Sequence, residues 1–213
     1  MEKIFSQLTG RYPELAAVIP ELEKCTGEIC ALFRRKGTLF VAGNGGSGAD
    51  AEHICSELLK GFLSRRELSD ADKALLLAVD PVNGAELGNK LQYGLPVISL
   101  LSHPALLTAF GNDVDGNFAF AQQLWALGRQ NDVFLGISTG GDAVNIRLAL
   151  AAARAKGITT ILLTGNRHGC CEALADIVIA VPESETYRIQ ELHLPLYHAM
   201  CRAIEAQFFQ QWS

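Results

Sequence analysis

The stretch from Thr38 to Phe62 constrains the fold of this chain more than any other segment. It opens with the apolar run TLFVA, which is typical of a buried strand, continues through the glycine-rich turn Gly43–Gly48 and enters a helix expected from about Ala49. A turn between a strand and a helix leaves free backbone N–H groups at the helix start, where the positive end of the helix dipole also lies. The stretch therefore predicts a binding site for an anion the size of a phosphate.

Two side chains on this expected helix could carry chemistry. His53 and Glu57 are four residues apart, which places them on one helix face, and they flank the apolar stripe rather than belong to it. An ordinary surface pair has the same spacing. The pattern alone therefore leaves both interpretations open.

The glycine turn also matches the dinucleotide-binding pattern G-x-G-x-x-G, which is a weak signal by itself. A dinucleotide site needs an acidic side chain after the second strand to hold a ribose. The next expected strand, Pro96 to Leu101, ends in Ser102 and His103 instead. The sequence therefore disfavours a nicotinamide or flavin site.

Composition excludes several classes of protein. A chain of 213 residues with 49% hydrophobic residues can bury a sizeable core as a single domain. The net charge of −5, with no run of Lys or Arg, argues against a general nucleic-acid surface. The start of the chain lacks the apolar segment of a signal peptide, and no 18-residue apolar run suggests a membrane span. We therefore expect a cytoplasmic protein with six reduced cysteines, since their spacing matches no zinc finger.

The second half of the chain alternates strands and helices. Helical segments are expected at 118–127 and 144–156, between continuous apolar runs of strand length. Those runs are Pro96–Leu101, Asp132–Ile137, Thr159–Leu163 and Ile177–Val181. With the first strand they predict an α/β fold, a doubly wound five-stranded parallel sheet flanked by helices, within a single domain over 1–213. Ligands bind at the carboxyl ends of such strands, where Ser138–Gly141 and Thr164–Gly165 join the first glycine turn to form a phosphate crevice.

The two ends of the chain and the region after the first helix complete this outline. Residues 1–36 form an N-terminal helical segment, with an apolar stripe from Tyr12 to Arg35 that Pro20 kinks or splits. The last helix, Glu185 to Gln211, carries apolar residues every fourth position, and Pro195 is expected to bend it. These stripes must cover the sheet or a partner chain. Residues 63–95 form an insertion that is either a helical hairpin or a lid.

Several motifs together resemble the SIS-domain (sugar isomerase) family and, within it, the phosphoheptose isomerases. They are GNGGSGADAEH at 43–53, AFGND at 109–113, STGGD at 138–142, LTG at 163–165 and RIQELHLPLYH at 188–198. The resemblance covers most of the chain except the insertion. It implies a flavodoxin-like SIS fold and a cytoplasmic homotetramer joined through the terminal helices. It also implies an enzyme that converts sedoheptulose 7-phosphate to D-glycero-D-manno-heptose 7-phosphate through an enediol.

The same resemblance assigns roles to individual residues. It implies a zinc ion (Zn2+) held by His53, Glu57, Gln190 and His198. Glu57 would be the base that takes the proton beside the carbonyl, and His198 the acid, with zinc polarising the oxygens. The implied substrate contacts come from Asn44, Gly45, Gly46, Ser47, Glu57, Asn112, Asp113, Ser138, Thr139, Gly140 and Gln190.

Two difficulties accompany these roles. A carboxylate that grips zinc is a poor base, so Glu57 must keep one oxygen free or release the metal during turnover. Gln190 and His198 are eight residues apart, which is about 12 Å along an unbroken helix. One zinc ion would then require a distorted helix entry around Gln190 or ligands from two subunits.

Other interpretations remain beside the enzyme. A non-catalytic SIS protein, such as the replication-initiator-associating relatives, would lack the full ligand set that this chain retains. A regulatory module that binds a sugar phosphate as a signal differs from an enzyme only in an activity assay.

One loop departs from the family pattern. Where phosphoheptose isomerases usually have S-T-S-G-N-S, this chain has STGGDA at 138–143, so hydroxyl groups are missing at Gly140 and Ala143. Asp142 replaces a neutral amide and is expected to cap the helix that starts at Val144. We therefore expect weak affinity for sedoheptulose 7-phosphate, or a different preferred substrate.

Overall fold

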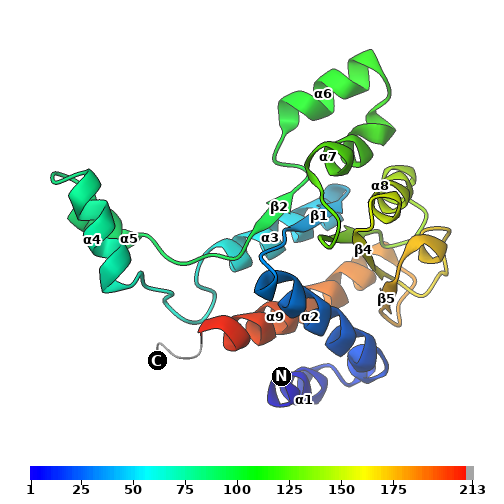
Figure 1. Ribbon diagram of the computed structural model, residues 1–213. Coiled ribbons are helices and arrows are strands. Elements are labelled where there is room, and N and C mark those ends of the chain that lie inside the picture. The colour runs from blue at the N-terminus through cyan, green and yellow to red at the C-terminus, as the bar shows by residue number, and fades with distance from the viewer. Residues whose placement is uncertain (210–213) are drawn as a thin grey trace.

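A single parallel sheet of five strands forms the centre of the computed structural model, which describes residues 1–209 (Figure 1). The strands are β1 (Leu39–Gly43), β2 (Val97–Ser99), β3 (Val133–Ile137), β4 (Thr159–Thr164) and β5 (Ile177–Ala180). Their spatial order is β2-β1-β3-β4-β5, and every neighbouring pair is parallel. This arrangement confirms the predicted doubly wound sheet and is the flavodoxin-like order.

Helices cover both faces of the sheet. The helices and helical turns before β3 are α1 (Glu2–Arg11), η1 (Pro13–Val18), α2 (Ile19–Arg34), α3 (Gly45–Leu59), α4 (Asp70–Val79), α5 (Gly84–Lys90), α6 (Pro104–Asp113), η2 (Gly116–Phe118) and α7 (Ala119–Leu127). Those that follow β3 are α8 (Val144–Ala155), η3 (Glu172–Leu174) and α9 (Thr186–Phe209). None of the helices in the described part of the chain is both long and apolar enough to cross a membrane.

The strands alternate their side chains between two cores. Val41 and Leu135 face α1, α2, α3 and α9, whereas Phe40 and Phe134 face α7 and α8. All five residues of β1 and of β3 are buried, because helices lie on both sides of these central strands. The continuous apolar runs of the sequence are thus explained by burial on two faces rather than one.

The edge strand β2 is shorter than predicted from Pro96 to Leu101. Pro96 has no N–H group to donate, and Ser102 N–H donates to Ser99 O at 3.2 Å, which turns the chain away after Ser99. Leu100 still donates to Val41 O at 2.9 Å. A three-residue strand therefore suffices to complete this edge.

The N-terminal segment differs from a single helix over 12–35. Pro13 lies in the first turn of η1 and Pro20 in the first turn of α2, positions where the missing N–H group costs no hydrogen bond. Pro20 therefore lies where η1 gives way to α2, which confirms the predicted split of this segment rather than a kink. The additional helix α1 packs on α9 through Phe5 and Leu8.

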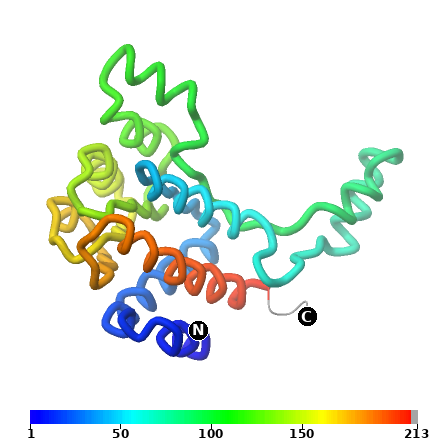
Figure 2. The backbone as a smooth tube through the Cα atoms, turned by 180° about the vertical axis from the view of Figure 1, so that it is seen from behind, coloured from blue at the N-terminus to red at the C-terminus, as the bar shows by residue number. Residues whose placement is uncertain are grey.

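Residues 63–95 contain a helical hairpin, which resolves the alternative that the sequence left open. Helices α4 and α5 pack against each other and project away from the sheet (Figures 1 and 2). Ser69 caps α4 by accepting a hydrogen bond from Asp72 N–H, and Asp80 Oδ1 accepts from Val82 and Asn83 in the turn between the helices. No residue of α4 is buried. We refer to residues 69–91 as the arm.

The C-terminal helix α9 runs across one face of the sheet beside α2 and α3. Pro195 lies inside it, and the helix continues on both sides of this residue. The predicted end at Gln211 lies outside the described residues.

The loop that follows α3 is attached to α9 by a buried charge pair. Arg66 is 1% exposed, and its Nε donates to Glu205 Oε1 at 3.0 Å. Glu205 also accepts backbone N–H bonds from Phe62, Leu63 and Ser64 at 2.8–3.2 Å. Burial alone would raise the pKa of Glu205, but these backbone donors and Arg66 outweigh it and hold the pKa below its ordinary value.

We predict that Glu205→Gln destabilises the fold by about 3–5 kcal/mol, because Arg66 would then carry a buried charge without a partner. Urea unfolding at neutral pH measures this loss, and Glu191→Gln on the exposed side of α9 is the matched control. The folded-state pKa of Glu205 is lowered, so its contribution is present at neutral pH and is lost as pH falls through that pKa. Equal unfolding free energies for Glu205→Gln and the wild type would contradict the prediction.

Candidate active site

The glycine-rich segment after β1 forms the first turn of a helix rather than a turn before it. Helix α3 begins at Gly45, four residues before the predicted start at Ala49, and Asn44 is its N-cap residue. Gly45 has φ of +53°, a left-handed conformation that glycine adopts without strain. A Cβ atom at Gly43 would lie 2.3 Å from Ser47 O. The glycines therefore allow the helix to start directly above the end of β1.

A second helix start lies beside the first one. Asn44 Nδ2 donates to Asn145 Oδ1, and Asn145 Nδ2 donates to Asn44 Oδ1, each at 2.8 Å. Asn145 lies in the first turn of α8. The reciprocal amide pair thus joins the positive ends of α3 and α8 at the carboxyl edge of the sheet. Sequence reasoning missed Asn145, although an amide one residue into an expected helix was visible.

The loops after β3 and β4 meet at the same edge. Gly165 N–H donates to Thr139 O at 3.0 Å, while Ser138 is buried and Thr139 half-buried. A Cβ atom at Gly140 would have no neighbour within 4 Å, so the loop is open at this position. The predicted convergence of three polar loops is therefore present in the structure.

Asp142 does not cap α8, as the sequence had suggested. The N-cap residue is Ala143, and no side chain caps this helix. Asp142 Oδ1 instead accepts the N–H group of Cys170 at 2.8 Å, and Cys171 N–H donates to Gly141 O at 2.9 Å. The Asp142 carboxylate thus accepts from the backbone N–H of Cys170, in the loop after β4, instead of from an N–H group at the start of α8. Asp142 therefore fastens two of the converging loops together.

Three of the predicted functional side chains cluster between α3 and α9. His53 Nε2 lies 3.2 Å from Glu57 Oε1 and 3.5 Å from His198 Nε2. The rings of His53 and His198 pack edge to face, with centroids 4.9 Å apart. Glu57 is only 8% exposed, and its second oxygen, Oε2, accepts from Lys60 Nζ at 3.3 Å. The carboxylate is thus held from both sides.

The electrostatic surroundings favour an uncharged His198. Burial, together with the nearby His53, lowers the pKa of His198 below its ordinary value, and Glu57 opposes this shift. At neutral pH the imidazole therefore has one N–H donor and one free nitrogen. A neutral imidazole next to a carboxylate can donate or accept a proton.

Gln190 lies apart from this cluster. A Cβ atom on Gly46 would come within 2.5 Å of Gln190 Nε2, so the amide covers the first turn of α3. Helix α9 is continuous from Thr186, and the distorted entry considered above is not observed. Gln190 therefore faces the glycine segment, while His198 lies two turns further along the helix.

Asn112 and Asp113 are not brought to the cluster. They end α6, which packs on η2 and α7, and both side chains are exposed. Asn112 Nδ2 donates to Asp113 Oδ1 at 2.8 Å. Among the described residues, no hydrogen bond links either side chain to the loops after β1, β3 and β4.

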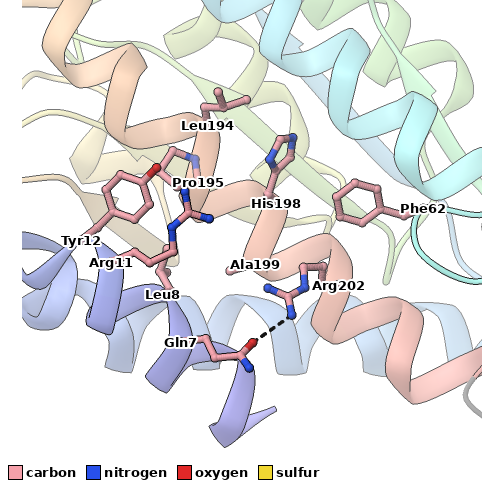
Figure 3. A pocket seen from close by; sticks show the side chains of 10 residues that line it. All are labelled: Gln7, Leu8, Arg11, Tyr12, Phe62, Leu194, Pro195, His198, Ala199 and Arg202. Atoms are coloured by element: carbon pink, nitrogen blue, oxygen red, sulfur yellow. Dashed lines mark hydrogen bonds between the residues drawn. The ribbon is translucent and has the colours of Figure 1, made fainter.

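His198 also borders a cavity of about 510 Å³ between α1 and α9 (Figure 3). Arg11 and Tyr12 reach into it from α1, and Arg202 lies one turn from His198 on α9. Arg202 Nη2 donates to Gln7 Oε1 at 3.0 Å. The cavity places two arginines, Arg11 and Arg202, on this side of His198 among largely apolar side chains.

The donor atoms of the cluster suit a zinc ion in type and in pairwise spacing. Zinc–nitrogen and zinc–oxygen bonds are about 2.0–2.2 Å long, so two ligands of a tetrahedral ion are about 3.3–3.5 Å apart. The distances from His53 Nε2 to Glu57 Oε1 and to His198 Nε2 are 3.2 and 3.5 Å. Within residues 1–209, however, no three His, Cys, Asp or Glu side chains yet converge as a complete metal site. His53, Glu57 and His198 therefore supply donor atoms of the kinds that zinc binds, but they do not form a complete metal site in the described part of the chain.

Comparison with known proteins gives one family. The phosphoheptose isomerase of Burkholderia pseudomallei (strain 1710b) is 34% identical over 192 residues, which cover 90% of this chain and 84% of the relative. That of Leptospira biflexa is 34% identical over 195 residues, 92% of this chain and 88% of the relative. The phosphoheptose isomerase structure from Francisella tularensis superposes with a TM-score of 0.75 at 28% identity, covering 95% of this chain and 94% of the other. No family model matches the chain.

Proposed function

The chain belongs to the phosphoheptose isomerase family, and on this premise we propose that it converts sedoheptulose 7-phosphate to D-glycero-D-manno-heptose 7-phosphate. The observation that carries the proposal is the cluster in which Glu57 and His198 both approach His53, at 3.2 and 3.5 Å. A base and an acid are thereby held within reach of one small substrate.

The reaction moves a proton between two neighbouring carbons of the sugar. Glu57 takes the proton from the carbon beside the carbonyl, which gives an enediol, and returns it to the adjacent carbon. His198 exchanges a proton with the oxygens of the enediol, for which its neutral imidazole is suited. Lys60 restrains Glu57 Oε2 and leaves the other oxygen, Oε1, on the side of His53.

The phosphate of the substrate belongs at the carboxyl edge of the sheet. The first turns of α3 and α8 offer free backbone N–H groups there, and the two helix dipoles add their positive ends. Ser138 and Thr139 supply hydroxyl donors from the neighbouring loop. Gln190 lies over the first turn of α3, which supports a contact with the sugar between the phosphate and the catalytic cluster.

We assign a zinc ion to His53, Glu57 and His198; because Gln190 of the same chain lies apart from these three, a fourth ligand from Gln190 would have to come from a second subunit. When bound, zinc stabilises negative charge on the sugar oxygens. The two oxygens of Glu57 have different neighbours: Oε1 faces His53 and would hold the metal, so Oε2 would exchange its contact with Lys60 for the substrate proton.

We further assign the enzyme to the cytoplasm and to a homotetramer. All six cysteines are free thiols, which suits a reducing compartment. The arm exposes apolar side chains, including Leu75 at 65%, Val79 at 86% and Val82 at 87%, which favours an assembly that covers them. A purely regulatory role as a sugar-phosphate sensor is not favoured, because the chain retains the acid–base cluster of an isomerase.

The metal assignment predicts about one zinc ion per chain in protein purified without chelators. His53→Ala should lose this metal, because His53 shares both close contacts of the cluster. Elemental analysis measures the zinc content, and His103→Ala, at the N-cap of α6, is the control. Full occupancy in His53→Ala would exclude this assignment.

The base assignment predicts that Glu57→Gln lowers kcat for sedoheptulose 7-phosphate by at least about 10²-fold, since an amide cannot take the proton. Formation of the aldose phosphate is the measurement, made at a known zinc content because the same change can weaken metal binding. Glu52→Gln, an exposed carboxylate on the same helix, serves as control. Turnover near that of the wild type in Glu57→Gln would place the base elsewhere.

The altered loop predicts a high KM for sedoheptulose 7-phosphate. Each missing hydrogen bond to a phosphate costs roughly 1.5–3 kcal/mol, and Asp142 adds a negative charge near the dianion. The triple variant Gly140→Ser, Asp142→Asn and Ala143→Ser should lower KM by about tenfold or more. The space at Gly140 admits a side chain, and an amide at 142 can still accept from Cys170. If the wild type already has the KM of the variant, other donors replace the missing ones, with Lys60 the first to test.

A further inference from the structure

A tyrosine beside the catalytic cluster plays no part in the mechanism described above. Tyr197 lies on α9, one residue before His198, and is 1% exposed. Its hydroxyl oxygen is 2.9 Å from His53 Nδ1 and donates to Asp50 Oδ1 at 3.3 Å. Its ring packs edge to face against both His53 and His198, with centroids 5.4 and 5.1 Å away.

The carboxylate of Asp50 relies on Tyr197 for its hydrogen bond. Asp50 lies one turn before His53 on α3 and is half-buried. Its Oδ2 atom is buried and has no hydrogen-bond partner among residues 1–209, and Tyr197 is the partner that these residues give Oδ1. A carboxylate only accepts hydrogen bonds, so the single hydroxyl hydrogen of Tyr197 points to Asp50.

The direction of the hydrogen bond from Tyr197 to Asp50 determines which nitrogen of His53 carries the hydrogen. Since the Tyr197 hydroxyl hydrogen is given to Asp50, its oxygen can only accept from the ring, and Nδ1 of His53 must carry the hydrogen. A metal ligand must be the neutral imidazole, which has one such hydrogen, so in that form Nε2 presents a lone pair towards Glu57 Oε1 and His198 Nε2. Two acceptors then face each other across 3.2 Å, an arrangement that a metal cation between them relieves.

We propose that Tyr197 is a positioning residue whose hydroxyl, held by Asp50, keeps the hydrogen of His53 on Nδ1 and so makes Nε2 available as a metal ligand. The inference rests on the proposed function in that it takes His53 as a zinc ligand. It adds a chain of three groups, in which the Asp50 carboxylate orients the Tyr197 phenol and the phenol orients the His53 imidazole.

The test compares Tyr197→Phe, which keeps the ring and removes only the hydroxyl, with the wild type. Long-range proton–nitrogen NMR of the metal-free protein reports which nitrogen of His53 carries the hydrogen. We expect Nδ1–H in the wild type and Nε2–H, donated to Glu57, in Tyr197→Phe. The zinc dissociation constant, measured by competition with a chelator, should rise by about 10- to 100-fold. Tyr187→Phe, an exposed tyrosine on the same helix, should change neither quantity.

Two results would overturn the proposal: Nε2–H on His53 in the wild type, or unchanged tautomer and zinc affinity in Tyr197→Phe. Should loss of the hydroxyl leave Asp50 so poorly satisfied that the variant does not fold, the double variant Tyr197→Phe with Asp50→Ala removes that carboxylate and gives the same readout. A wild type that shows the expected tautomer and binds zinc but does not isomerise sedoheptulose 7-phosphate would refute the proposed function and leave the role of Tyr197 intact.

Discussion

The packing of α3 against α9 is the contact on which the whole catalytic cluster depends. These helices are more than 120 residues apart in the sequence, and both rest on the same face of the sheet. Ile54 and Leu58 on α3 and Leu196 and Met200 on α9 belong to one buried core. Because the polar groups emerge at the margin of this apolar contact, their separations are set by core packing rather than by flexible loops.

The same contact separates two tasks along one helix pair. Glycines and free N–H groups lie at the start of α3, where phosphate binding is proposed. Two to three turns later, His53 and Glu57 meet His198, where proton transfer is proposed. The proposed phosphate site and the proposed proton-transfer site are therefore separated along the axis of α3.

The sequence was sufficient for the parts of the fold that local patterns determine. Apolar runs of strand length located all five strands, and helical spacing placed His53 and Glu57 on one face. The sequence was insufficient where a long-range contact or an unusual backbone angle determines the local structure. The early start of α3 depends on φ of Gly45, and Asp142 pairs with Cys170 from a different loop instead of its own helix. Tyr197 received no role from the sequence, because its partner Asp50 lies 147 residues away.

The arm also has a consequence for how the chain folds. At its base Glu67 and Gln92 form an antiparallel bridge, and Tyr93 N–H donates to Arg66 O at 2.8 Å. This neck closes the intervening residues into a loop whose two helices pack against each other. The chain that must be ordered between α3 and β2 is then only the short segments on either side of the neck. The neck thereby lowers the entropic cost of closing the loop that pairs β2 with β1, so the long insertion adds little to the cost of assembling the sheet.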